Sequence, residues 1–276
     1  MSRFGGVPVR EALDSAVVAL SAAGVDTPRL DAEVMLAHVL GVDRARLVIE
    51  RDRPVEGPAV QAFQSAVRRR SAGREPVAYI TGTKGFRHLD LDVDARVLIP
   101  RPETEGLVEA ALTLPAGARV ADVGTGSGAV ALALKDERPD LDVVATDASA
   151  DALAVARANA ARLGLDVTFV EADLLAGVGP VDAVVSNPPY VEDGAALAPE
   201  ITRHEPPGAL YAGADGLDVI RRLAAQAGAS PARFLALEIG AGQAAAVADV
   251  AREAGFAEVA VEPDLAGIER IVVARR

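Results

Sequence analysis

Asn187, Pro188, Pro189 and Tyr190 are the residues whose types and spacing most clearly suggest chemistry. They follow an apolar run at 181–186 that is typical of a buried strand, and ligands of open α/β sheets bind at the carboxyl ends of strands. Because proline has no N–H, this bend is rich in carbonyl acceptors. The side-chain oxygen of Asn187 and the flat ring of Tyr190 would complete a site for a planar –NH2 group. The alternative interpretation is a proline-rich turn that only ends a strand.

A glycine-rich loop lies upstream of this motif, between a predicted strand at 120–123 and a predicted helix that begins near residue 129. Its residues are Gly124, Thr125, Gly126, Ser127 and Gly128. Glycine adopts turn conformations that other residues avoid, and it lets the backbone come close to a ligand. The spacing is G-x-G-x-G rather than the G-x-G-x-x-G of dinucleotide binders, so the loop predicts a nucleotide site in the same type of fold without specifying a dinucleotide.

Acidic residues stand near the ends of the predicted strands. Asp147 lies 23 residues after Gly124, where an acid in such folds binds the ribose hydroxyls. Asp122, directly before the glycine loop, could bind a cationic ammonium, which suits a nucleoside that carries an amino acid better than a pyrophosphate. Asp173 and Leu174 follow the third strand and could flank an adenine, although an ordinary strand-end turn explains Asp173 equally well.

Together these features suit S-adenosylmethionine, with its ribose at Asp147, its amino-acid portion near the glycine loop and its sulfonium directed at Asn187. Methyl transfer is then an in-line displacement in which alignment supplies most of the rate. An amide nitrogen is a poor nucleophile because its lone pair is delocalised. Acceptors that hold the –NH2 group and stabilise its developing positive charge would favour the reaction. A strong base is not needed, since the proton can leave after methylation.

From residue 119 onward, predicted strands and helices alternate, which is typical of a parallel α/β sheet. Strands are expected at 120–123, 143–147, 167–170, 181–186 and 234–238, and helices at 103–114, 129–135, 149–163, 216–228 and 243–254. Residues 191–215 are rich in Gly and Pro and are expected to form an irregular functional loop. The last two strands, 257–262 and 269–274, are too close for a helical crossover and should pair antiparallel. We therefore predict a doubly wound, mostly parallel sheet with a reversed edge hairpin.

Residues 1–75 are expected to form a helical bundle. Thr27 before Pro28 is typical of the start of a helix, with Thr27 as its N-cap. Alternation at 76–99 predicts a β-hairpin linker, and residues 100–276 would then form the methyltransferase domain. The arginine run 68–70 ends a predicted helix, where a solvated face is the expected arrangement. The alternative is a docking patch for an acidic or RNA-associated partner.

Composition limits the classes of function. The 276 residues include no cysteine, which excludes disulfides, thiolate zinc sites and cysteine nucleophiles. His38, His88 and His204 show no metal-ligand spacing, so we expect no metal site. The sequence has no run of eighteen apolar residues, and residues 1–6 lack the apolar core of a signal peptide. A cytoplasmic protein is the simplest expectation.

Charge is distributed unevenly along the chain. Residues 1–75 carry 11 Lys+Arg and 10 Asp+Glu, whereas residues 76–276 carry 17 and 30. The excess of acidic residues in 76–276 argues against tight binding of nucleic-acid phosphates. The aromatic content of 3% is also too low for a base-stacking platform. We therefore expect no membrane partner and no direct, specific nucleic-acid partner.

The chain resembles the bacterial protein-glutamine N5-methyltransferases of the HemK/PrmC family, which modify peptide-chain release factors. The resemblance extends over nearly the whole chain. It rests on the stretches LDAE at 30–33, REPVAYI at 74–80, LIPRPETE at 98–105, DVGTGSG at 122–128, SNPPY at 186–190, LEIG at 237–240 and DLAG at 264–267. The four residues 187–190 alone are shared with adenine-N6 DNA methyltransferases, whereas the stretch at 98–105 and the helical N-terminal domain are more specific.

This resemblance implies a class I, Rossmann-like methyltransferase fold that uses S-adenosylmethionine. The implied substrate is the glutamine of a Gly-Gly-Gln tripeptide in class-1 release factors. By resemblance, Asn187 and the Pro188 carbonyl would bind the amide –NH2 group, and Tyr190 would line the pocket. The glycine loop, Asp147 and the region around 173–174 would hold the cofactor, and residues 1–75 would help to recognise the release factor.

Three other functions would use some of the same residues. An adenine-N6 methyltransferase would use the motif at 187–190, but the acidic catalytic domain and the lack of an evident target-recognition domain disfavour it. A glutamine methyltransferase acting on a large-subunit ribosomal protein shares the core motifs, and only the resemblance of the helical domain favours the release factor. A non-catalytic cofactor-binding module, or a nicotinamide-binding Rossmann domain, is disfavoured by the intact motif beside the intact glycine loop.

Overall fold

The computed structural model describes residues 6–276, and this part of the chain forms two compact units. One unit comprises the residues up to Gly82 together with Leu197–His204, and the other comprises Thr83–Ala196 and Glu205–Arg276. The sequence placed the corresponding boundary at residue 75 and assigned 197–204 to an irregular loop. Of the first six residues, for which we predicted no signal peptide, only Gly6 lies within the described part.

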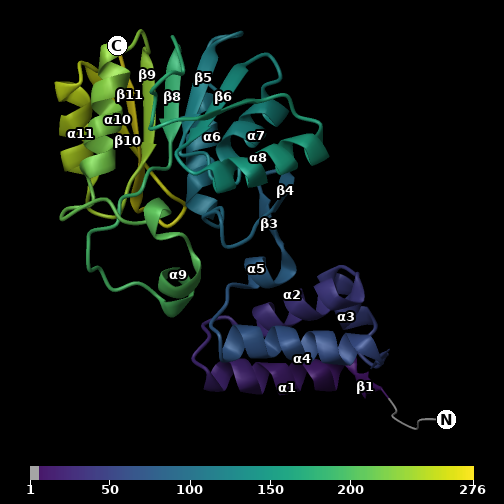
Figure 1. Cartoon of the computed structure of the whole chain (residues 1–276). Coiled ribbons are helices and arrows are strands. Elements are labelled where there is room, and N and C mark those ends of the chain that lie inside the picture. Colours follow the sequence, from purple (N-terminus) through teal and green to yellow (C-terminus); the bar gives the residue numbers. More distant parts are fainter. Residues whose placement is uncertain (1–5) are drawn as a thin grey trace. The chain divides into compact units, whose positions relative to one another are not determined.

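The first unit is a bundle of short helices (Figure 1), as predicted. Its helices are α1 (Val9–Ala22), α2 (Pro28–Leu40), α3 (Arg44–Ile49), α4 (Pro58–Ser71), α5 (Val77–Thr81) and α9 (Pro199–His204), and β1 (Val7–Pro8) pairs with β2 (Pro54–Val55). Leu13 and Leu20 of α1 pack with Met35 and Leu36 of α2 and with Phe63 of α4. The apolar stripes of these amphipathic helices thus form the core of the unit.

Thr27 occupies the N-cap position of α2 and Pro28 begins the helix, as predicted, but the Thr27 side chain makes no capping bond. Its hydroxyl donates to Asp31 Oδ1 at 2.8 Å instead. One local prediction for this unit is wrong: residues 79 and 80, predicted in the hairpin, lie in α5, which is followed by Gly82 with a left-handed φ of 75°. A short alternation of apolar residues does not distinguish a strand from a single helical turn, which explains the error.

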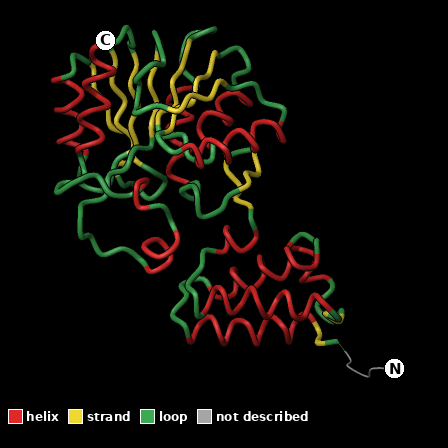
Figure 2. Tube along the Cα trace, viewed as in Figure 1, coloured by secondary structure: helices red, strands yellow, loops and turns green. Residues whose placement is uncertain are grey.

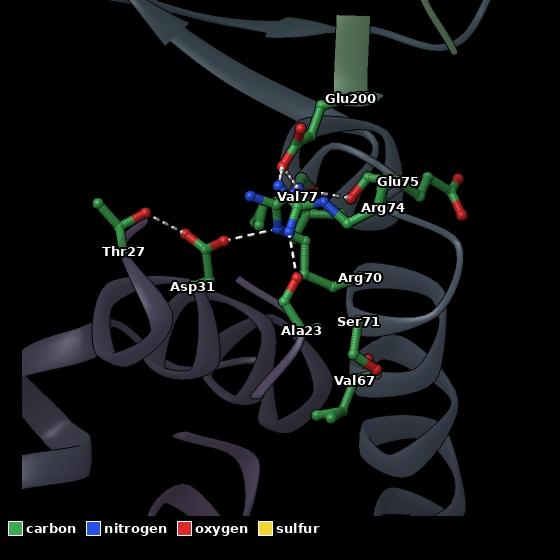
Figure 3. Close-up of polar contacts among 11 residues, drawn as sticks. Ala23, Thr27, Asp31, Val67, Arg70, Ser71, Arg74, Glu75, Val77 and Glu200 are labelled. Atoms are coloured by element: carbon green, nitrogen blue, oxygen red, sulfur yellow. Dashed lines mark hydrogen bonds and ion pairs between the residues drawn. The ribbon is translucent and has the colours of Figure 1, made fainter. Parts of the chain in front are cut away.

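A buried ion cluster joins α2, α4 and α9 within this unit (Figure 3). Arg70 Nε donates to Asp31 Oδ2 at 2.7 Å, and Arg70 Nη1 donates to Glu200 Oε1 at 3.1 Å. Arg74 Nη2 lies 2.5 Å from the same Glu200 oxygen. Because the Arg70 side chain is only 10% exposed, the prediction that the run 68–70 is a solvated face is wrong for Arg70. The two arginines before it are exposed.

The second unit is built around a seven-stranded sheet in the order β10-β11-β9-β8-β5-β6-β7 (Figure 1). Its strands are β5 (Arg119–Val123), β6 (Asp142–Asp147), β7 (Thr168–Glu171), β8 (Ala183–Ser186), β9 (Phe234–Glu238), β10 (Glu258–Pro263) and β11 (Glu269–Arg275). Strands β5 to β9 run parallel to one another, whereas β11 pairs antiparallel with both β9 and β10. The mostly parallel sheet and its reversed edge hairpin are therefore confirmed.

Helices cover both faces of this sheet (Figure 2). They are α6 (Glu105–Ala111), α7 (Ala129–Glu137), α8 (Ala150–Leu163), α10 (Asp218–Ala229) and α11 (Ala244–Glu253). Alternate strand residues point to opposite faces. Val120 and Val143 therefore pack with α6 and α7, while Val184 and Leu235 pack with α10 and α11. This arrangement is the predicted doubly wound fold.

Several elements after residue 82, including α9 of the first unit, are shorter than predicted or were missed. A hairpin of β3 (Thr83–Phe86) and β4 (Leu89–Asp92) occupies the centre of the predicted linker 76–99. The predicted helix 103–114 is a 3-10 turn, η1 (Pro102–Thr104), followed by α6. Within 191–215, where no regular structure was predicted, α9 forms together with the turn η2 (Pro207–Ala209). Between residues 6 and 276 no helix is long and apolar enough to cross a membrane.

Parallel strands bring their carboxyl ends to one edge of the sheet. The register places Val123 of β5 beside Thr146 of β6 and beside Ser186 of β8. It also places Ser186 beside Leu237 of β9. The glycine loop, Asp147, the motif at 187–190 and the end of β9 are consequently neighbours in space.

Candidate active site

The glycine loop connects β5 to α7 in a conformation that requires glycine. Gly124, Gly126 and Gly128 have φ angles of 73°, 56° and 86°, in the left-handed region that other residues enter only at a cost. A Cβ atom on Gly128 would also lie 2.9 Å from Leu132 Cδ1. The N–H of Gly124 donates to the Thr146 carbonyl at 2.8 Å, which attaches the loop to β6.

Asp122 stabilises this loop from inside the fold. Its side chain is buried, and Oδ2 accepts hydrogen bonds from Thr125 Oγ1 at 2.6 Å and from the N–H of Ala131 at 3.1 Å. Burial raises the pKa of Asp122 to about 6, while the bonds from Thr125 and Ala131 oppose that rise. The carboxyl group also lines a small cavity with Thr125 and Ser127. The structure thus gives Asp122 an internal role, and its binding of a ligand ammonium stays a prediction.

Asp147 is held by two backbone N–H groups at the end of β6. Its Oδ2 accepts from Gly126 at 2.9 Å, and its Oδ1 accepts from Ser149 at 2.9 Å. Each carboxylate oxygen can accept a further hydrogen bond, so the side chain is oriented without being saturated. Ser149 Oγ accepts from the N–H of Ala152 at 3.2 Å, so Ser149 caps the N-terminus of α8.

Asn159 fixes the glycine loop from the other side, and the sequence did not identify it. It is fully buried on α8, and its Nδ2 donates to the Ser127 carbonyl and to the Asp92 carbonyl, each at 3.0 Å. Its Oδ1 accepts from the N–H of Asp92 at 2.8 Å. Asn159 therefore joins the β3–β4 hairpin to the loop. The sequence does contain one signal for this role: Asn159 is a polar residue on the apolar stripe of the predicted helix 149–163, where a buried polar group needs hydrogen-bond partners.

A cleft of about 500 Å³ lies at this edge of the second unit, within the size range of small-molecule sites. Among the predicted residues it is lined by Gly124, Gly126, Asp147, Asp173, Leu174, Asn187 and Pro189. Asp173 is exposed and forms an ion pair with Arg222. Leu174 has a φ of 57°, which is unusual for a leucine, and its carbonyl accepts from Thr146 Oγ1 at 3.0 Å. Pro188, Tyr190 and Gly128 do not line this cleft.

Asn187 directly follows β8 and is half-buried beside the cleft. Its Nδ2 donates to Thr104 Oγ1 at 3.1 Å. The donor end of the amide is thereby occupied, and Oδ1 is left as the acceptor of this side chain. Ser186 Oγ donates to the Val123 carbonyl at 2.6 Å and fixes the start of the motif against β5.

Tyr190 is held at both ends of the residue. Its hydroxyl donates to Glu238 Oε1 at 3.3 Å, and its backbone carbonyl accepts from Gln243 Nε2 at 3.1 Å. Burial, followed by the charge of Glu238, raises the pKa of Tyr190, so the phenol stays protonated. The sequence did not assign a role to Glu238 or Gln243. One signal in the sequence could have identified Glu238: it is an acid at the end of the otherwise apolar strand 234–238.

The stretch at 98–105 also borders the site. Leu98, Pro100 and Thr104 line the small cavity that Asn187 shares with the glycine loop. Arg101 Nη2 donates to both carboxylate oxygens of Glu205, at 2.6 and 2.8 Å. Burial raises the pKa of Glu205, and the Arg101 guanidinium opposes this rise. The sequence drew attention to the stretch at 98–105 through its resemblance to the family, but it did not reveal Glu205 as the partner of Arg101.

The order of the sheet, the glycine loop after β5 and the acid at the end of β6 define a class I methyltransferase fold. Two family models match the chain: PrmC N-terminal domain over residues 11–82, and Methyltransferase small domain over residues 86–204. The chain belongs to the family of release factor glutamine methyltransferases, as its resemblance to known sequences implied, and it is a methyltransferase.

Individual relatives support this assignment. The chain is 46% identical over 276 residues to the release factor glutamine methyltransferase of Deinococcus radiodurans. The alignment covers 97% of this chain and 98% of the relative. It is 44% identical over 273 residues to the enzyme of the same name from Rhodospirillum rubrum, covering 96% and 84%. A crystal structure of a methyltransferase from Pyrococcus furiosus shares the fold, with a TM-score of 0.52 at 18% identity, over 68% of this chain and 88% of that one.

Proposed function

We propose that this enzyme transfers a methyl group from S-adenosylmethionine to the side-chain nitrogen of the glutamine in the Gly-Gly-Gln motif of class-1 release factors, in support of translation termination. The observation that carries the proposal is the orientation of Asn187. Its Nδ2 is bonded to Thr104, so its Oδ1 is the atom available to a ligand at the cleft. An acceptor at this place suits an –NH2 group as substrate.

The residues around the cleft fit S-adenosylmethionine. The left-handed glycines 124 and 126 leave room for close approach of a ligand, and Asp147 lines the same cleft with acceptor capacity to spare. Asp147 would hold the ribose hydroxyls, and Leu174 would lie against the adenine with Asp173 beside it. A ligand ammonium near Asp122 would favour the charged form of this buried carboxyl. When bound, the cofactor supplies an electrophilic methyl group.

The chain's own residues would orient the substrate amide and stabilise its charge. Asn187 Oδ1 and the Pro188 carbonyl would accept the two hydrogens of the –NH2 group, and the ring of Tyr190 would lie against its plane. These acceptors favour the positive charge that develops on nitrogen as the methyl group is transferred. The rigid attachments of Thr104 to Asn187 and of Glu238 to Tyr190 reduce the reorganisation that the reaction requires.

The helical domain predicted at 1–75 would help to recognise the release factor, and such a substrate would place the enzyme in the cytoplasm. The acidic region 76–276 disfavours a direct, specific nucleic-acid substrate. A ribosomal-protein glutamine would require the same acceptors as the release-factor glutamine. Only a comparison of substrates separates these two possibilities.

Asn187→Ala tests the proposed site. Turnover of a Gly-Gly-Gln substrate should fall about 100-fold or more, because one of the acceptors that orient the amide is lost. The dissociation constant of S-adenosylmethionine, measured by calorimetry, should change only modestly. Unchanged turnover would rule out the orienting role of Asn187.

A further inference from the structure

Gln243 stands at the N-cap position of α11, yet its side chain makes no capping bond. Residues that cap helices are normally short, and their side chains accept hydrogen bonds from the first turn. The side chain of Gln243 is bonded elsewhere: Nε2 donates to the Tyr190 carbonyl at 3.1 Å, and Oε1 accepts from the N–H of Gly240 at 2.8 Å. It therefore serves the segments that follow β8 and β9 rather than the helix that it precedes.

The orientation of this amide is fixed by its partners. A backbone carbonyl only accepts and a backbone N–H only donates, so Nε2 must face Tyr190 and Oε1 must face Gly240. Nε2 also lies 3.4 Å from the Asp215 carbonyl, in the turn before α10, where the contact is weaker. One amide thus joins three segments at the carboxyl edge of the sheet.

Two glycines leave the space that this arrangement requires. A Cβ atom on Gly216 would overlap the Tyr190 carbonyl oxygen and lie 3.0 Å from Gln243 Nε2. A Cβ atom on Gly240 would lie 2.9 Å from Gln243 Oε1 and 3.3 Å from Tyr190 Cδ2. Because a packed interior does not tolerate such overlaps, a side chain at either position would displace the amide or the backbone of Tyr190.

We propose that Gln243 is a positioning residue, an inference that rests on the proposed function: it holds the backbone of Tyr190 and thereby the Pro188 carbonyl that would accept the substrate –NH2 group. Pro188 and Pro189 have no N–H with which to bond the bend to its surroundings. Ser186 fixes the start of the motif against β5, and Gln243 anchors its end. Gln243 is not one of the described residues that line the cleft, so it acts through the motif and not on the cofactor.

Three substitutions separate the donor of this amide from its acceptor. Gln243→Lys keeps a donor for the Tyr190 carbonyl, Gln243→Glu keeps only an acceptor for the Gly240 N–H, and Gln243→Met keeps neither. With a Gly-Gly-Gln substrate, kcat should fall about 10- to 100-fold in Gln243→Glu and Gln243→Met, because a displaced acceptor misaligns the substrate amide. In Gln243→Lys the retained donor should keep kcat within about fivefold of wild type.

Two further measurements serve as controls. The dissociation constant of S-adenosylmethionine, measured by calorimetry, should stay within about twofold of wild type in all three variants, since a local change of the motif leaves the cofactor contacts in place. Ala246→Lys and Ala246→Glu place the same charges one turn further along α11, at an exposed position, and should leave kcat unchanged.

Wild-type activity with kcat of all three variants within about threefold of wild type would overturn this inference alone. Equal losses in Gln243→Lys and Gln243→Met would also overturn it, because the bond donated to Tyr190 would then not decide the rate. A loss of cofactor affinity that parallels the loss of kcat would show a general disturbance of this edge and would overturn it as well. An inactive wild-type enzyme with bound cofactor would overturn the proposed function, and this inference with it.

Discussion

Glu200 holds α9 to the helical unit, and its replacement by glutamine should release that helix. In Figure 3 the Glu200 carboxylate faces the guanidinium groups of Arg70 and Arg74. The three side chains are between 10% and 16% exposed. With Asp31 included, the cluster carries two positive and two negative charges. Glu200→Gln leaves Arg74 without a carboxylate in this buried cluster.

The size of the effect follows from burial. Removing one partner of a buried ion pair costs about 3–5 kcal/mol. We expect the lower end, about 3 kcal/mol, because Glu200 is partly exposed and Asp31 still neutralises Arg70. A helix of six residues is not stable by itself, so this loss should appear as local opening of α9. At about 1.4 kcal/mol per factor of ten, protection of α9 should fall about 100-fold.

Native-state hydrogen exchange measures this opening directly. The relevant amides include Thr202, whose N–H donates to the Ala198 carbonyl at 3.2 Å. Glu192→Gln, at an exposed position of the same connecting segment, is the matched control and should leave α9 protected. If the α9 amides exchange at the same rate in Glu200→Gln and in wild type, the ion cluster does not hold this helix and the reasoning fails.

Three further predictions concern the second unit. Asp147→Asn should raise the dissociation constant of S-adenosylmethionine about 100-fold in calorimetry, since hydrogen bonds to a charged group are worth about 1.5–3 kcal/mol; an unchanged constant would count against the ribose site. Gly126→Ala should lower the free energy of unfolding by about 1–2 kcal/mol in urea titration, because the φ angle of Gly126 is 56° and alanine is strained there. Gly208→Ala is the control: Gly208 has open space around it and no left-handed φ, so the free energy of unfolding should stay unchanged. Arg101→Met leaves Glu205 buried and unpaired. Burial already raises the pKa of Glu205 above its usual 4.5, so the variant's deficit in thermal stability should grow as the pH rises above 4.5 and shrink as the pH falls; a deficit independent of pH would refute this.

The fold of the second unit could be predicted because periodicity and chain length constrain it strongly. Apolar strands such as 181–186 and 234–238 alternate with helices of adequate length, and only a parallel sheet accommodates this order. The spacing between 262 and 269 allowed only an antiparallel hairpin. The element α9 was missed because its six residues show no apolar periodicity and owe their place to Glu200.

The candidate site was predictable where chemistry is local in sequence. The glycine loop, Asp147 and the motif at 187–190 each lie at the carboxyl end of a strand, so the topology alone brings them together. Asn159 and Glu205 act across the fold, through bonds to Ser127 and Arg101, and a single sequence does not reveal such pairs. The ligand contact predicted for Asp122 stays a prediction, and its hydrogen bonds with Thr125 and Ala131 add an internal role that the sequence did not reveal. The burial of Arg70 depends on Asp31 and Glu200, which lie far from it in sequence.

The central claim is tested most directly by labelling. S-adenosylmethionine with a labelled methyl group is incubated with the enzyme and a class-1 release factor that carries either Gly-Gly-Gln or Gly-Gly-Ala. We predict incorporation into the first protein and none into the second. Equal incorporation into both would place the methyl group elsewhere. No incorporation into either, with cofactor binding demonstrated in the same sample, would contradict the release-factor substrate and favour a ribosomal-protein or nucleic-acid substrate.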